Sequence, residues 1–169
     1  MNGLDCILTR RSIRQYTPDP VSDEEVKQML SAAMAAPSAG NEQPWHFVVI
    51  RDRELLDAVP RFHPHAQMLV QAPLAIVVCG DPSLERYKGY WMVDCSAATQ
   101  NILLAAHALG LGSVWIGVWP VEDRVEEMRA LLGIAHGIVP FALIALGRPG
   151  EHKGPSSRFD EGRVHKDRW

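Results

Sequence analysis

The chain has 169 residues, 47% of them hydrophobic and 22% charged, and its 17 lysines and arginines against 20 aspartates and glutamates give a net charge of −3. This length and composition are typical of one soluble globular domain, with little room for a second domain that could complete a large site. The slightly acidic balance excludes a protein that binds nucleic acid through general electrostatic attraction.

The cysteines and the apolar segments indicate the cellular compartment of the protein. Cys6, Cys79 and Cys95 are odd in number, widely spaced and without a C-x-x-C pair, which argues against a disulfide framework or a zinc knuckle and favours a reducing compartment. No apolar run approaches the roughly 20 residues of a membrane helix, and charged residues precede any run of signal-peptide length. We therefore expect a cytoplasmic protein with no membrane partner.

The first half of the chain predicts two helices, a loop and a strand, in that order. Apolar residues at i, i+3, i+4 spacing indicate a short helix over residues 4–8. Ser22 and Glu25 form a capping-box pattern, and the apolar stripe that follows predicts a helix that ends before the next proline. Residues 37–44 are rich in proline and polar side chains and predict a loop, after which residues 45–50 indicate a buried strand.

The second half alternates helices with strands and ends in a polar tail. In chain order the pattern predicts a short helix at 52–56, a strand at 74–79, a long helix at 91–109, a strand at 114–118, a helix at 121–132, a strand at 139–146 and the tail at 151–169. The long helix is rich in small residues, which let another helix approach closely. This alternation argues for a sheet covered by helices, with the strand directions still open.

Three arginines and a serine stand close together in the segment Arg10-Arg11-Ser12-Ile13-Arg14. Guanidinium groups match phosphate oxygens with paired hydrogen bonds, so the segment is a candidate phosphate site. The alternative is a solvated helix end, where arginines interact favourably with the negative pole of the helix dipole. Composition alone leaves both interpretations open.

The loop over residues 37–44 supplies serine, asparagine and glutamine side chains that can hydrogen-bond a polar heterocycle, although an ordinary turn has the same composition. The pair Gly110-Leu-Gly112 follows a helix and precedes a strand, the reverse of the order in which glycines hold a dinucleotide pyrophosphate. His63-Pro64-His65 has no nearby carboxylate or cysteine that would complete a ligand set, so we predict no metal site.

The combination of these segments resembles the nitroreductase family of FMN-dependent oxidoreductases over nearly the whole chain. The segment Arg10 to Arg14 is similar to the family's Arg-x-Ser-x-Arg motif, and Pro37 to Trp45 is similar to its Pro-Ser-x-x-Asn-x-Gln-Pro-Trp loop. The long small-residue helix, the segment Trp115-Ile116-Gly117 and the late Ser157-Arg158 also match family features.

The resemblance implies a single domain over residues 1–169, with an α+β three-layer fold and a central, mixed and mostly antiparallel sheet flanked by helices. It implies a homodimer in which a domain-swapped arm, residues 150–169, embraces the partner, and in which both subunits build two FMN sites at the interface. The cofactor-binding residues that it implies are Arg10, Arg11, Ser12, Arg14, Pro37, Ser38, Ala39, Asn41, His65, Trp115, Ile116, Gly117 and Arg158. Pro37, Ser38, Ala39 and Asn41 are expected to come from the second subunit.

The activity implied by the resemblance is electron transfer from NAD(P)H to a small organic acceptor, such as a nitroaromatic compound or a quinone, by a ping-pong mechanism. Because the flavin carries the redox chemistry, we assign no catalytic side chain and expect Trp115 and Ile116 to act through backbone atoms or ring contacts. The alternative from another functional class is a protein that binds or stores flavin without NAD(P)H turnover.

Overall fold

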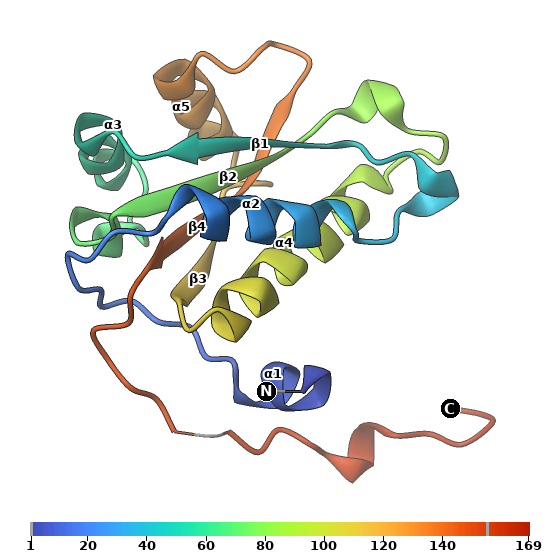
Figure 1. Cartoon of the computed structure of the whole chain (residues 1–169). Coiled ribbons are helices and arrows are strands. Elements are labelled where there is room, and N and C mark those ends of the chain that lie inside the picture. Colours follow the sequence, from blue (N-terminus) through green and yellow to red (C-terminus); the bar gives the residue numbers. More distant parts are fainter. Residues whose placement is uncertain (1, 155) are drawn as a thin grey trace.

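The centre of the fold is a four-stranded sheet in the order β1-β2-β4-β3, in which every neighbouring pair is antiparallel (Figure 1). The computed structural model describes residues 2–154 and 156–169. The strands are β1 at Trp45–Ile50, β2 at Leu74–Gly80, β3 at Gly112–Gly117 and β4 at Val139–Gly147. The described part of the sheet has one parallel contact, an isolated bridge between Ser12 and Ser113.

Helices cover the sheet on both faces and make three layers. On one face lie α2, Asp23–Met34, and α4, Trp91–Ala108; on the other lie α3, Arg53–Ala58, and α5, Glu122–Leu132. The sheet can serve two cores because neighbouring side chains of a strand point to opposite faces. In β2, Ile76 packs with the α2 and α4 side, and Val77 packs with the α3 and α5 side.

The short helix α1, Gly3–Thr9, lies against the C-terminal end of α4 (Figure 1). Thr9 Oγ1 is 2.8 Å from His107 Nε2, and the Cys6 thiol donates to the carbonyl of Leu104 at 3.3 Å. The outer side of α1 exposes the apolar side chains of Leu4, Ile7 and Leu8 to solvent. These exposed side chains leave apolar surface available on this side of the fold.

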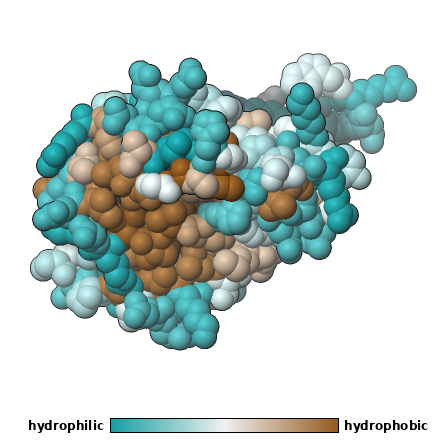
Figure 2. Space-filling view, turned by 90° about the horizontal axis from the view of Figure 1, so that it is seen from above, coloured by the Kyte–Doolittle hydropathy of each residue, from teal (hydrophilic) through white to brown (hydrophobic). Residues whose placement is uncertain are grey.

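A second apolar area lies on the opposite side of the molecule, where α3 and α5 are found. Figure 2 shows apolar side chains gathered there in one area, with polar side chains around it. Several hydrophobic residues packed on the α3 and α5 core are partly exposed, among them Val48, Leu55, Ile134 and Ile138. The helices α3 and α5 therefore leave part of this core within reach of solvent.

The end of the chain leaves the body of the fold and runs past α1 to a C-terminus far from the sheet (Figure 1). The side chain of Phe159 is 82% exposed and that of Trp169 is fully exposed. The first residues of this segment do contact their own chain, since Lys153 Nζ donates to the carbonyl of Ser12 at 2.7 Å. The first residues of the tail therefore pack on their own chain, whereas Phe159 and Trp169 do not.

The helices and strands predicted from the sequence are confirmed, with small shifts of their ends. The strand expected at 114–118 begins at Gly112, because Gly112 pairs with Gly147 at the far end of β4. The helix expected from residue 121 begins at Glu122 and ends at Gly133, which has the positive φ of 63° common in helix caps. Among the described residues, no helix is long and apolar enough to cross a bilayer.

Candidate functional site

A groove of about 490 Å³ lies along β3, at the edge of the sheet. This size is within the usual range for small-molecule and cofactor sites, about 300–1,000 Å³. Its lining comes from three parts of the chain: Arg14, then Pro64, His65, Gln67 and Met68, and then Val114, Trp115, Ile116 and Gly117. The structure thus brings together five residues predicted from distant sequence positions: Arg14, His65, Trp115, Ile116 and Gly117.

The backbone of β3 faces this groove because β3 is an edge strand. The carbonyl of Ser113 accepts from Ile13 N at 3.0 Å and the carbonyl of Gly117 accepts from His63 Nε2 at 2.8 Å, so both point away from β4. In an antiparallel pair the outward backbone groups come from every second residue. The N–H and C=O of Trp115 therefore point outward along the groove, where they can hydrogen-bond a planar heterocycle.

His63 fixes one end of the groove from inside the core. Its ring is fully buried, Nε2 contacts the carbonyl of Gly117, and Nδ1 accepts from the backbone N–H of His65 at 3.3 Å. Nε2 lies next to a carbonyl and must donate, so it carries a proton, whereas Nδ1 accepts an N–H and carries none. The ring is therefore neutral. Burial lowers the pKa of His63, and the nearby charge of Arg124 lowers it further, which agrees with this protonation state.

Arg14 lines the groove, and further arginines gather near the end of α1, where Arg10 lies close to Arg11 and Arg158. Arg10 is half-buried, and its pKa is lowered first by burial and then by the charges of Arg11 and Arg158. In the described parts of the chain, none of Arg10, Arg14 and Arg158 has an acidic partner within ion-pair distance. Like charges that crowd together without a carboxylate are suited to an anionic ligand.

Arg11 is placed differently from its neighbours. Its guanidinium donates to the carbonyls of Leu8, Arg10 and Gly154 at 2.9, 2.6 and 3.0 Å. Arg11 also lines a second cavity, of about 560 Å³, on the other side of the segment. The structure therefore does not bring Arg11 to the groove with Arg14.

The loop with Pro37, Ser38, Ala39 and Asn41 is held at the N-terminal end of α4. The backbone N–H of Ala39 donates to Asp94 Oδ1 at 3.0 Å, and Ser38 Oγ accepts from Gln43 N at 3.1 Å. Gly40, Asn41 and Gln43 have positive φ values of 53°, 56° and 47°. Such values cost free energy for residues other than glycine, so the surrounding hydrogen bonds must hold the loop in this shape.

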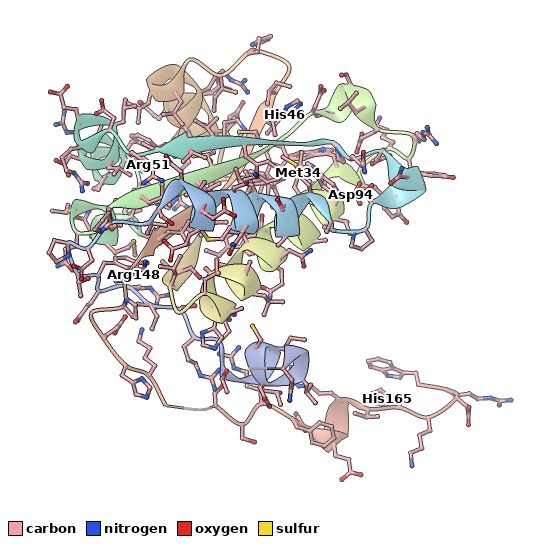
Figure 3. All side chains as sticks on the ribbon, viewed as in Figure 1. Met34, His46, Arg51, Asp94, Arg148 and His165 are labelled. Atoms are coloured by element: carbon pink, nitrogen blue, oxygen red, sulfur yellow. The ribbon has the colours of Figure 1, made fainter. Side chains whose placement is uncertain are left out.

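The two halves of the predicted site lie far apart within one chain. Asp94 holds the loop at one end of α4, whereas His107 contacts the segment that leads into Arg10 at the other end. Because an α-helix rises by about 1.5 Å per residue, Asp94 and His107 lie about 20 Å apart along the axis of α4. Figure 3 shows Asp94 beside the 37–44 loop, with Arg148 on the opposite side of the fold. Within one chain the loop is therefore held away from the segment that carries Arg10.

Several residues that the structure places in or behind the groove are absent from the predicted set. Gln67 and Met68 line it, and His63 holds its far wall. A signal for His63 is present in His63-Pro64-His65, but that pattern by itself points only to a metal. Among the described residues, no three His, Cys, Asp or Glu side chains are grouped in a way that could hold a metal ion.

Comparison with known proteins gives matches over almost the whole chain. The sequence model of the Nitroreductase family matches residues 7–73 and 57–148. A protein of Methanothermobacter thermautotrophicus, named as a candidate NADH dehydrogenase/NAD(P)H nitroreductase, is 52% identical over 169 residues, which are 100% of this chain and 88% of that protein.

Solved structures agree with the sequence match. A candidate NADH dehydrogenase/NAD(P)H nitroreductase from Parabacteroides distasonis superposes with a TM-score of 0.96 at 39% identity, covering 100% of both chains. A candidate nitroreductase from Desulfovibrio desulfuricans, solved in complex with FMN, superposes with a TM-score of 0.86 at 33% identity, covering 100% of this chain and 98% of that one.

Proposed function

This chain belongs to the nitroreductase family, and from that premise we propose that it is a cytoplasmic, FMN-dependent oxidoreductase that passes electrons from NAD(P)H to a small organic acceptor. The observation that supports FMN most directly is the coincidence of two features in one groove. The groove is lined both by the outward-facing backbone of β3 and by Arg14, whose guanidinium has no acidic partner among the described residues. Such a site suits a ligand with a flat polar heterocycle and a phosphate.

The residues present fit FMN. Arg10, Ser12 and Arg158 would hold the phosphate and ribityl groups, because guanidinium and hydroxyl groups suit phosphate oxygens. Arg14 and His65 would lie at the pyrimidine end of the ring system, where a cation favours the reduced, anionic flavin. Arg11, the remaining arginine of the predicted set, would support the segment through its bonds to backbone carbonyls.

The complete site would need a second copy of the chain. Within one chain the loop of Pro37, Ser38, Ala39 and Asn41 lies at the Asp94 end of α4, away from the arginine segment. The apolar surfaces of α1 and of the arm are exposed. A homodimer would cover those surfaces and would bring the loop of one subunit to the groove of the other. The arm over residues 150–169 would then pack on the partner.

The protein's own contribution to the reaction is binding and orientation. Bound FMN would supply the chemistry of hydride and electron transfer. The outward N–H of Trp115 and the buried His63, through Gly117, would fix the position of the ring, and the arginines would stabilise negative charge on it. Because donor and acceptor would occupy the same groove in turn, we expect ping-pong kinetics with nitroaromatic compounds or quinones as acceptors.

An anaerobic absorbance spectrum of the FMN-loaded protein, taken before and after mixing with NADH or NADPH, tests this proposal. Rapid bleaching of the visible flavin band, followed by its return when a quinone or a nitroaromatic compound is added, is the expected result. A bound flavin that NADH and NADPH reduce no faster than free FMN would instead indicate a flavin-binding or storage protein. Failure to bind FMN would exclude both functions.

A further inference from the structure

Two carboxyl groups, Asp94 at the start of α4 and Glu42 in the 37–44 loop, are buried side by side. The residues are only 3% and 9% exposed. Burial of even one charged carboxylate is costly unless it is paired, and two adjacent negative charges also repel each other. The described chain shows no cationic side chain within ion-pair distance of either group.

Each carboxyl group uses one oxygen to accept backbone N–H groups. Asp94 Oδ1 accepts from Ala39 N at 3.0 Å, and Glu42 Oε2 accepts from Arg86 N at 2.7 Å and from Tyr87 N at 3.4 Å. The other two oxygens, Asp94 Oδ2 and Glu42 Oε1, are buried and have no N–H or O–H partner in the described chain. One tight turn brings the two side chains together, because Asp94 accepts from the N–H of Ala39 and the N–H of Glu42 donates to the carbonyl of Ala39 at 3.1 Å.

We propose that Asp94 and Glu42 share one proton, and that this carboxyl–carboxylate hydrogen bond fixes the loop that covers the FMN of the partner subunit. A single proton between Asp94 Oδ2 and Glu42 Oε1 satisfies both unpartnered oxygens and removes one of the two negative charges. The inference rests on the proposed function only where it concerns FMN, since the proton itself is a property of the free protein.

The surrounding charges place the proton on Asp94. Burial raises the pKa of Asp94, and the neighbouring carboxylates of Glu42 and Glu85 raise it further. Burial also acts to raise the pKa of Glu42, but the N–H groups that it accepts and the charge of Arg86 outweigh burial and lower that pKa. Glu85 is itself held by the backbone N–H groups of Gly89 and Trp91, so it does not compete for the proton.

The pair connects three parts of the structure: the 37–44 loop, the segment before α4 and α4 itself. Glu42 reaches the segment before α4 through Arg86, and Asp94 reaches the loop through Ala39. Between these anchors Asn41 has a positive φ, which the loop must hold against its intrinsic preference. Repulsion between two charged carboxylates would push these anchors apart and release the turn.

The sign of the pH effect follows from the raised pKa of Asp94. A group with a raised pKa stabilises the fold at pH values below its unfolded pKa, and this stabilisation is lost as the pH rises through the folded value. Loss of the shared proton at alkaline pH should therefore loosen the loop and weaken FMN binding in the dimer. Replacement of either carboxyl by its amide keeps a donor between the two oxygens at every pH.

Infrared difference spectroscopy of the FMN-free protein tests the shared proton directly. The wild type at about pH 6, where exposed carboxyl groups are ionised, should show the C=O stretch of a protonated carboxyl group. That band should be absent from both Asp94→Asn and Glu42→Gln and present in Glu127→Gln, which alters an exposed carboxylate. A wild type without the band, or a band that both variants retain, would overturn the shared proton.

FMN titrations from about pH 5 to about pH 9 test the link to the site. The dissociation constant of the wild type and of Glu127→Gln should rise by up to about tenfold per pH unit while the linked proton is lost. In Asp94→Asn it should stay within about twofold. Parallel pH profiles for the wild type and Asp94→Asn would overturn the positioning role. If no form binds FMN, the proposed function fails, while the infrared result still decides whether the proton is shared.

Discussion

Neighbouring residues in the segment from Arg10 to Arg14 have different surroundings, although they look equivalent in the sequence. Arg14 lines the groove along β3, whereas Arg11 and Ile13 line the cavity on the other side of the segment. This alternation is expected of an extended chain, in which successive side chains point to opposite sides. The motif therefore combines a side chain that faces the groove with side chains that face the cavity on the other side.

Replacement of Arg10 tests the phosphate assignment. Arg10→Ala removes a charge-assisted contact worth about 1.5–3 kcal/mol, so the FMN dissociation constant should rise by about 10- to 150-fold in a fluorescence titration. Arg61→Ala, at an exposed arginine far from the groove, is the matched control and should leave the constant unchanged. Equal affinities in the two variants would contradict the assignment.

Because His63 is neutral in the folded protein, the stability of the fold should depend on pH, and one substitution at His63 should remove that dependence. Its pKa lies below the ordinary value of 6.5, so the unfolded chain takes up a proton before the folded chain does, and stability is lost as the pH falls below 6.5. His63→Gln keeps a donor for the carbonyl of Gly117 but does not titrate. Its melting temperature should therefore fall less than that of the wild type between about pH 7 and about pH 5.

The control for this measurement is His136→Gln, which changes an exposed histidine on the far side of α5. Its melting temperature should follow the wild-type curve at each pH. A His63→Gln curve that runs parallel to both would show that His63 does not stay neutral in the folded protein.

At the level of elements, the functional surface depends on the edge position of β3. A central strand would use its backbone groups in two ladders, whereas β3 pairs only with β4 along most of its length. At its start the free edge is covered by the bridge between Ser12 and Ser113, and beyond that point the groove begins. The same strand thus anchors the arginine segment and offers its backbone to a ligand.

The close approach of that segment to β3 depends on Gly112. A Cβ atom at this position would lie 2.7 Å from Ile13 Cγ2 and 2.9 Å from Ile13 Cβ. Gly112→Ala should therefore push the segment away from β3, at a cost of about 1–3 kcal/mol in the free energy of unfolding, and weaken FMN binding as well. Chemical denaturation and FMN titration measure the two effects.

Gly137→Ala is the matched control, because a Cβ atom there would meet no atom within 4 Å. It should change neither the stability nor the affinity. If Gly112→Ala behaved in the same way, the tight packing of the segment against β3 would not be needed for the site.

For the whole molecule, the length of α4 sets the distance between the 37–44 loop and the arginine segment. The helix separates the loop at Asp94 from the arginine segment at His107 by about 20 Å. The same chain exposes apolar side chains on α1 and along the arm, which makes a second copy the natural partner. Dimerisation would thus complete the site and cover the exposed surface together.

Removal of the arm tests its role in assembly. A chain that ends at Gly154 keeps the contact between Lys153 and Ser12 but loses Phe159 and Trp169. Burial of one large apolar side chain contributes about 1.5–3 kcal/mol, so the dissociation constant of the dimer should rise by at least about tenfold. Sedimentation at matched concentrations measures the change, with circular dichroism to verify the fold. An unchanged constant would exclude an embracing role.

The local sequence alone determined most of the elements, because helix caps, apolar periodicity and turn residues act over a few neighbouring positions. Ser22 and Glu25 do form the capping box of α2, and Gly133 does end α5. Arg14 and Trp115, which the family resemblance implies as cofactor-binding residues, lie on two walls of one groove, and each belongs to a motif within one short stretch of chain.

Only the tertiary structure decided which residues share a site, because that depends on contacts between segments far apart in the chain. Antiparallel pairing with β4 left β3 at the edge, and the fold placed the fully buried His63 behind the groove. The same packing buried Asp94 against Glu42, two acids that a sequence pattern would assign to solvent. Burial changes the preferred protonation state of such groups, and burial is a property of the folded chain.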